Sequence, residues 1–332
     1  MSLLFYVVSG QVRHRATTHV GYDESQPWQS CSAYGDDAPD ANDRISMQPI
    51  KIALIGAVFF SAAAQVAAAD SVTLGTNNWA ENVAVSNMWQ QLLAEKNIDV
   101  ELSEISKPLL FGGLASGDID LFLEVWIPSD QTYVDRYSQD VELHETWYDD
   151  ARDTLVVPSY VEGIDSVADL AEREEDFTYQ GQPTIFGIGP GATISDETDA
   201  AIEQYSLPFR QLSSSETAML AQLEEAYRRK EPIALTLWQP HWVFAKYDLK
   251  ILDDPKGALV SGQQVKWLAE KGFDESHPGV AAMLDAWHMT PEQLSTLMLE
   301  IEKTGDPDQG AAQWIDDNRE LVDGWLAADD DG

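Results

Sequence analysis

The sequence predicts an α/β fold with two lobes, each a mostly parallel sheet flanked by helices. Apolar runs of strand length alternate with helical patterns between residues 72 and 126, and the alternation returns between residues 184 and 238. Such alternation is typical of βαβ units, which build parallel sheets. From residue 277 onward the pattern is only helical. The chain has 332 residues, 44% of them hydrophobic, which is enough for a large core or two lobes.

The elements can be placed in order along both lobes. In the first, strands are expected at 72–75, 99–105 and 119–126, with helices at 81–97 and 109–117. In the second, strands are expected at 184–189, 208–212 and 233–238, with helices at 193–205 and 216–230. Five further tryptophans lie on helical patterns and are expected to pack in the core: Trp89, Trp267, Trp287, Trp314 and Trp325.

The charge is strongly acidic. Twenty lysines and arginines stand against 57 aspartates and glutamates, for a formal charge of -37. Nucleic acid is therefore excluded as a partner, because binding its phosphates needs a basic surface. An acidic surface is usually explained by solubility and does not name a ligand.

The segment 47–69 has the features of a secretory signal peptide. Lys51 precedes a short apolar run, and alanines at 67 and 69 form a small-residue cleavage site. The strongly apolar part, 52–60, is shorter than the ~20 residues of a membrane span. We expect a mature chain beginning near Asp70 that is periplasmic and not lipid-anchored. Residues 1–46, which hold the single cysteine, are expected to be a non-native upstream extension.

One motif occurs in both lobes. Each of two predicted strands ends in Trp-x-Pro, with Trp126 before Pro128 and Trp238 before Pro240. Proline cannot donate to a strand ladder, so each strand should stop just after its tryptophan. Ligands of open parallel sheets bind at the carboxyl ends of strands. Trp126 and Trp238 are therefore candidates for a binding crevice, whereas Trp242, beyond Pro240, is expected to pack.

A third tryptophan, Trp79, follows the first predicted strand and can join the other two. Trp79, Trp126 and Trp238 together would form an aromatic cage. A tetra-alkylated ammonium group cannot donate hydrogen bonds, so its recognition depends on cation–π attraction, about 0.5 to 2 kcal/mol per ring. Glu81 would add a compensating negative charge.

The turn before the predicted helix at 193–205 is a candidate anion site. A Gly-Pro-Gly turn places the amides of Gly191, Ala192 and Thr193 at a helix N-terminus, where unpaired donors suit a carboxylate. A cation cage facing an anion site fits a zwitterion such as a betaine.

These motifs resemble a known family. From about Val72 to Trp325 the chain resembles the substrate-binding proteins of glycine betaine, proline betaine and choline ABC importers. The resemblance rests on five segments: GTNNWAEN (75–82), EVWIPS (124–129), TLVVPSYV (154–161), GIGPGAT (187–193) and WQPHWVFAKYDLKILDDP (238–255). It implies a type II periplasmic binding protein that closes on its ligand, with two crossings between lobes.

The resemblance also implies roles for particular residues. The three cage tryptophans would box a trimethylammonium group. Choline-type members add an acidic residue, matched by Glu81, and a tyrosine in the lobe-crossing strand, matched by Tyr160. In betaine-type members the turn amides hold the carboxylate, matched here by residues 191–193. Lobe 1 is expected at 70–157 and 253–332, and lobe 2 at 158–252.

One position departs from the family. Many betaine-binding members have a histidine five residues after the middle tryptophan, and this chain has Gln131. An amide can donate a hydrogen bond but brings no charge. The ligand therefore stays open among glycine betaine, choline, carnitine, proline betaine and dimethylsulfoniopropionate. His241, beside Trp238, is expected at the hinge or rim of the site.

The sequence thus predicts a monomeric, non-enzymatic receptor for a quaternary ammonium or sulfonium compatible solute, which docks on an inner-membrane ABC permease. No catalytic residues, cofactor or metal site are expected, since the histidines are isolated and no nucleophile motif occurs. The alternative is a secreted carbohydrate-binding or carbohydrate-acting protein, because tryptophans also stack on sugars. Hydrolysis of sugars requires paired carboxylates, however, and only Glu81 is obviously placed for this.

Overall fold

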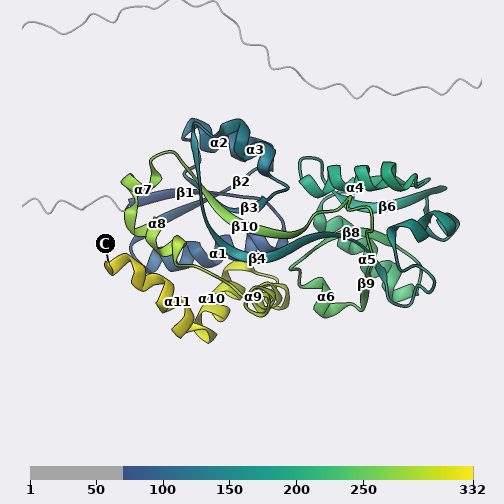
Figure 1. Cartoon of the computed structure of the whole chain (residues 1–332). Helices are drawn as coiled ribbons and strands as arrows, with labels where there is room; N and C mark the ends of the chain where they lie inside the picture. Colours follow the sequence, from purple (N-terminus) through teal and green to yellow (C-terminus); the bar gives the residue numbers. More distant parts are fainter. Residues whose placement is uncertain (1–69, 332) are drawn as a thin grey trace, which may run out of the picture. The chain divides into compact units, whose positions relative to one another are not determined.

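The computed structural model describes residues 70–331 (Figure 1). The chain divides into two units, 1–64 and 65–332, and everything described lies in the second. The predicted signal peptide at 47–69 and the extension at 1–46 lie outside the described residues. Within residues 70–331, none of the helices is long and apolar enough to cross a membrane.

Ten strands form one mixed sheet, whose order is β2-β1-β3-β10-β4-β8-β6-β5, with β7 beside β6 and β9 beside β4. The strands are β1 (Asp70–Thr76), β2 (Ile98–Glu104), β3 (Leu121–Ile127), β4 (Val141–Pro158), β5 (Thr178–Tyr179), β6 (Gln182–Ile188), β7 (Arg210–Ser214), β8 (Ala234–Gln239), β9 (Leu249–Ile251) and β10 (Ser261–Glu270).

Helices flank this sheet, and the last part of the chain is helical, as predicted (Figure 1). The helix at Thr193–Tyr205 begins and ends where the sequence predicts. The α-helices are α1 (Ala80–Glu95), α2 (Lys107–Ser116), α3 (Gln131–Tyr137), α4 (Thr193–Tyr205), α5 (Glu216–Arg229), α6 (Val243–Lys246), α7 (Phe273–Ser276), α8 (Pro278–Asp285), α9 (Pro291–Thr304), α10 (Pro307–Asp317) and α11 (Arg319–Leu326). Short 3-10 helices cover Val167–Glu172, Glu174–Phe177 and Ala327–Asp331.

The long strand β4 connects two parallel groups of strands. On one side, β2, β1 and β3 are parallel and form the core of lobe 1; on the other, β8, β6 and β7 are parallel and form the core of lobe 2. Strand β4 pairs with β10 up to Arg152 and with β8 from Arg152 onward. Figure 1 shows β4 passing from one group into the other. The predicted boundaries, 70–157 and 253–332 against 158–252, stay a prediction.

Two core tryptophans lie outside the helices that the sequence predicts for them: Trp287 follows the end of α8 at Asp285, and Trp267 lies in a strand. Trp267 is fully buried, as expected, but it belongs to strand β10 and not to a helix. Val265, Trp267 and Ala269 are all buried, a spacing of two that marks one face of a strand. The helix-forming residues between them suggest a helix locally, and pairing with β3 and β4 on both sides overrides that preference.

The helical tail covers α1 through an aromatic cluster. Trp89 of α1 lies edge-on to Trp287, with ring centroids 5.5 Å apart, and stacks on Trp325 at 6.2 Å. Trp287 also stacks on Trp147 of β4, with centroids 4.2 Å apart. Trp89, Trp287, Trp314 and Trp325 are all buried, so their predicted place in the core is confirmed.

Candidate functional site

The two Trp-x-Pro motifs occupy matching places in the sheet. Trp126 is the second-last residue of β3, and Trp238 is the second-last residue of β8. Each strand ends at the residue before its proline, as predicted, and both of these X-Pro peptide bonds are cis. The motifs therefore place one tryptophan from each lobe at the carboxyl end of a parallel strand.

These two tryptophans line one cavity of about 30 Å³, together with the third predicted tryptophan. Trp126 and Trp238 are buried, whereas Trp79 is half-buried. The lining residues come from both lobes and include four ionisable side chains: Trp79, Glu81, Lys107, Glu124, Trp126, Asp153, Ile188, Ala192, Thr193, Ile194 and Trp238. We call this group the cage.

A larger cleft of about 480 Å³ adjoins the cage. Its walls include the Gly-Pro-Gly turn (189–191) and Ser213–Ser215 from lobe 2, and Asn77 from lobe 1. Trp79, Lys107 and Ala192 line both spaces. Trp79 therefore stands between the cleft and the cage, where it separates the outer space from the inner one.

Two buried glutamates hold the cage tryptophans by their indole N–H groups. Trp238 Nε1 donates to Glu81 Oε2 at 2.8 Å, and Trp126 Nε1 donates to Glu124 Oε1 at 3.0 Å. The first bond joins the lobes, because Glu81 is in α1 and Trp238 is in β8. Both bonds use the ring edges, so they fix the rings and leave their faces for packing.

The carboxyl groups of the two glutamates influence each other's pKa. Burial raises the pKa of both carboxyls, and the Glu81 charge raises the pKa of Glu124 further, well above its ordinary value. Oε2 of Glu124 is buried and has no hydrogen-bond partner among the described residues. Burial therefore favours the protonated form of these carboxyls more than water does.

A third carboxyl, Asp153, lines the cage from β4, the strand shared by both lobes. Burial, followed by the charge of Glu197, raises the pKa of Asp153 well above its ordinary value. Its Oδ2 accepts a hydrogen bond from Gln263 Nε2 at 2.7 Å, and Gln263 Oε1 accepts from the Ser129 amide at 3.2 Å. Asp153 is therefore fixed from β10 at the point where the two lobes meet.

The positive group of the cage is Lys107, which is already paired. Its Nζ lies 2.7 Å from Asp130 Oδ2 and 4.9 Å from the Trp79 ring centroid. Burial lowers the pKa of Lys107, but the carboxylates around it, Asp130 first, outweigh burial, and the result is a raised pKa. Asp130 also accepts from the Trp126 amide and from Thr193 Oγ1 at 2.8 Å, which links lobe 1 to α4 of lobe 2.

The predicted anion turn lies at the edge of this space. Gly191 has φ of +100°, and an added Cβ would lie 3.1 Å from Pro108 of the other lobe, so both backbone and packing require glycine. Gly191 lines the outer cleft, and Ala192 and Thr193 reach the cage. The Ala192 amide already donates to the Gly189 carbonyl at 3.5 Å, and the Ser195 amide donates to the Ala192 carbonyl at 3.0 Å. Of the three predicted turn amides, those of Gly191 and Thr193 are the better placed to bind an anion at this helix N-terminus.

Besides Gly191, which lines only the outer cleft, three predicted site residues do not line the cage: Gln131, Tyr160 and His241. Gln131 donates to Asp135 along the exposed side of α3. Tyr160 lies past the end of β4, where its hydroxyl donates to the carbonyl of Glu231 at 2.8 Å. The resemblance implies a tyrosine of the crossing strand, matched by Tyr160. In this structure the residue of the crossing strand β4 that lines the cage is Asp153. The reason is that β4 changes its partner from β10 to β8 next to Asp153, seven residues before Tyr160.

His241 lies behind the cage wall. Its ring is edge-on to Trp238, with centroids 5.0 Å apart, and Nε2 lies 3.1 Å from Glu216 Oε1. Glu216 in turn accepts from the amide of Ala80 at the start of α1. His241 therefore supports Trp238 from outside and links lobe 2 to the first helix of lobe 1. Trp242 is buried in the core, as predicted.

The sequence analysis missed Glu124, Asp153 and Lys107. Glu124 gave a readable signal, because an acidic residue inside the apolar run LFLEVW is costly to bury unless it has a partner. Asp153 and Lys107 gave none, since both sit in ordinary polar surroundings along the chain. Only the fold brings them to the same cavity.

Comparisons with known proteins identify the family of this chain. Residues 70–317 match the family model described as the substrate binding domain of ABC-type glycine betaine transport systems. The glycine betaine/carnitine transport binding protein of Listeria monocytogenes is 37% identical over 157 residues, which is 46% of this chain and 52% of that protein. The chain thus spans about half the length of this curated relative.

Solved structures match over more of the chain. Lactococcal OpuAC, in its closed-liganded conformation complexed with glycine betaine, is 30% identical, with a TM-score of 0.72, over 77% of this chain and 99% of that chain. An ABC-transporter choline binding protein in complex with choline is 25% identical, with a TM-score of 0.70, over 77% and 91%. The predicted two-lobed, type II periplasmic-binding-protein fold is confirmed. The chain belongs to the family of substrate-binding domains of ABC-type glycine betaine transport systems.

Proposed function

We propose that this protein is a periplasmic receptor, and not an enzyme, that captures a quaternary ammonium solute in the tryptophan cage and delivers it to a membrane permease. One observation carries the proposal: Trp79, Trp126 and Trp238 surround a single cavity whose polar lining is mainly carboxyl groups. A methylated ammonium is bound by aromatic faces and opposite charge, and the cage supplies both. A carbohydrate-acting protein is not favoured by the comparisons.

The ligand must share this space with charges that are already present. The Glu81–Glu124 pair offers a negative charge to the ammonium group, next to the faces of Trp126 and Trp238. The amides that begin α4 lie on the lobe 2 side and suit a carboxylate. A zwitterion such as glycine betaine uses both ends, whereas choline uses the cage and the carboxyls alone.

Entry of such a ligand requires the lobes to move apart. A cavity of about 30 Å³ has room for little more than a water molecule, and a trimethylammonium group is larger. Separation would break the bonds from Trp238 to Glu81 and from Thr193 to Asp130. Hinge closure of this kind, around the paired segments at Asp153 and Val260, would bury the ligand before it reaches the permease.

A calorimetric panel tests the ligand class. Glycine betaine, choline, carnitine and dimethylsulfoniopropionate are titrated into the purified protein, with a thermal-shift screen of sugars alongside. We expect at least one methylated onium compound to bind with one site per chain. Stabilisation by millimolar sugars together with no response to any onium compound would overturn the proposal.

A separate experiment tests the location. The protein is expressed with its own N-terminus in a Gram-negative host, and the periplasmic fraction is analysed by N-terminal sequencing. We expect the chain in that fraction to begin at or near Asp70. Recovery of a chain that begins at Met47 or Met1 only from the cytoplasm would contradict export and cleavage.

A further inference from the structure

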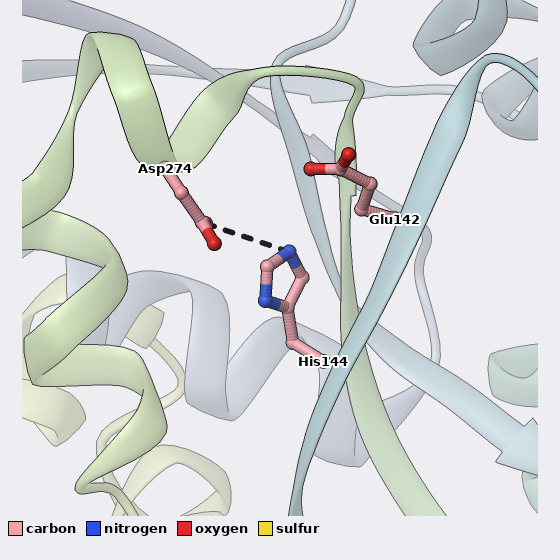
Figure 2. A group of neighbouring side chains, drawn as sticks. All are labelled: Glu142, His144 and Asp274. Atoms are coloured by element: carbon pink, nitrogen blue, oxygen red, sulfur yellow. Dashed lines mark ion pairs between the residues drawn. The ribbon is translucent and has the colours of Figure 1, made fainter.

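A second group of ionisable side chains lies in lobe 1, and none of its residues lines the cage. Glu142 and His144 are two residues apart in β4, so both project from one face of the strand. Asp274 belongs to α7, which follows β10. One ligand atom from each of the three lies within 4.8 Å of the others. Figure 2 shows the edge of the His144 ring between the carboxyl groups of Asp274 and Glu142.

The imidazole of His144 is fixed and lacks a hydrogen-bond partner. Its side chain is only 10% exposed, and it stacks on Trp267 with ring centroids 3.6 Å apart and planes 8° apart. Nε2 is buried and has no hydrogen bond among the described residues. It faces Asp274 Oδ1 at 3.7 Å, which is longer than a hydrogen bond. A buried imidazole nitrogen without a partner is costly unless something else binds it.

The surroundings of this nitrogen are acidic. Burial raises the pKa of the nearby Asp285 carboxyl; His144 and the hydrogen bond from Trp267 lower it, and the charges of Glu145 and Asp274 raise it. Asp285 is held in place by Trp267, whose Nε1 donates to its Oδ1 at 3.1 Å. The same tryptophan therefore orients both the imidazole and a neighbouring carboxyl. Together with Glu142, these groups create a negative potential that favours a bound cation.

We propose that Glu142, His144 and Asp274 form a binding site for a divalent transition-metal ion such as Zn²⁺, which ties β4 to α7. One imidazole nitrogen and two carboxylate oxygens suit zinc and its neighbours, whereas magnesium and calcium prefer oxygen ligands alone. Three protein ligands leave one position of a tetrahedral zinc ion for water.

The observed spacing is compatible with such a site. Ligand atoms that each lie about 2.1 Å from a tetrahedral ion are about 3.4 Å from one another. The three ligand atoms here lie within 4.8 Å of one another, so metal binding requires them to move closer together. Asp274 can make this movement, because its side chain is 52% exposed and belongs to a short helix, while His144 stays fixed against Trp267.

The competing explanation is an ordinary ion pair between His144 and Asp274, which needs no metal. The two differ in their response to zinc. After treatment with a chelator, the full-length protein is titrated with ZnCl₂ by calorimetry and followed by thermal shift, with MgCl₂ and CaCl₂ as comparison ions. We expect one zinc per chain, a higher melting temperature, and no comparable effect of Mg²⁺ or Ca²⁺.

Three variants assign the site. Loss of a residue that only supports a metal ligand lowers metal affinity on the order of 10-fold to 100-fold. Asp274→Asn and His144→Ala each remove a proposed ligand, so each should lower the affinity for zinc by at least that much. If His144→Ala destabilises the core, Asp274→Asn still tests the site, because the Asp274 side chain is exposed and its replacement leaves the core intact. His288→Ala is the matched control, since His288 also pairs with an aspartate, Asp149 at 3.4 Å, in an exposed place. Zinc binding unchanged in Asp274→Asn, lost equally in His288→Ala, or matched by Mg²⁺ would overturn the proposal.

Discussion

Replacement of Trp238 by alanine is the sharpest test of the cage. Trp238 is 3% exposed and forms the lobe 2 wall, and its Nε1 donates to Glu81 Oε2 at 2.8 Å. The substitution removes an aromatic face from the cage. It also removes the donor from Glu81, which is buried and already shares its environment with Glu124.

The two losses have different magnitudes. One cation–π wall contributes about 0.5 to 2 kcal/mol to the binding of a desolvated cation. Loss of the Trp238–Glu81 bond weakens the contact between lobes in the closed state, and a hydrogen bond to a charged group contributes about 1.5 to 3 kcal/mol. Part of that loss is recovered when water enters the enlarged cavity. Since each 1.4 kcal/mol is tenfold in affinity, we expect ligand binding to weaken on the order of 10-fold to 100-fold.

Calorimetry with the tightest ligand of the panel measures this change, and circular dichroism confirms that the variant is folded. Trp238→Phe keeps an aromatic face and loses the N–H donor, so it should weaken binding less than Trp238→Ala. Trp242→Ala is the control, because Trp242 is buried outside the cage and should affect stability but not affinity. Equal affinity in Trp238→Ala and the unmodified protein would refute the assignment of Trp238 as a wall.

Three further predictions follow from the same geometry. The pKa of Glu124 is raised above its ordinary value of 4.5, so protonated Glu124 stabilises the folded state fully below pH 4.5, and this stabilisation is lost as pH rises through the raised pKa. The melting temperature of the unliganded protein should therefore fall as pH rises over that range. The fall should be less steep in Glu124→Gln. A fall equally steep in Glu124→Gln would contradict this. Gln131→His should change the affinities for glycine betaine and choline by less than about twofold, because Gln131 donates to Asp135 outside the cage. If calorimetry shows that the variant reverses the order of the two affinities, Gln131 belongs to the site after all. Tyr160→Phe should leave affinity unchanged and lower the free energy of unfolding by about 1 kcal/mol, for the lost bond to the Glu231 carbonyl; weakened binding in that variant would restore Tyr160 to the site.

The structure also changes the interpretation of the ligand site's charge. The sequence presents Glu81 as a single compensating carboxylate, and the fold surrounds it with Glu124, Asp153 and the paired Lys107. Burial raises the pKa values of Glu124 and Asp153, so the fold favours their uncharged forms more than water does.

The α/β class, the order of most elements and the three tryptophans that line one cavity could all be predicted from local sequence patterns. The reason is local: strand and helix periods are readable in windows of a few residues, and Pro128 and Pro240 stop β3 and β8 wherever those strands pack. The burial of Trp89 could be predicted in the same way, because it lies on the apolar face of α1.

The polar residues that share the cage could not be predicted from the sequence, because long-range strand pairing brings them together. Asp153 reaches it because β4 changes its partner from β10 to β8 next to that residue, and Trp267 lies in a strand because β10 is paired on both sides. Such pairings join residues more than 80 positions apart, so no local pattern contains them. The burial that raises the carboxyl pKa values arises in the same way, from the two lobes meeting over side chains that are unremarkable in the sequence.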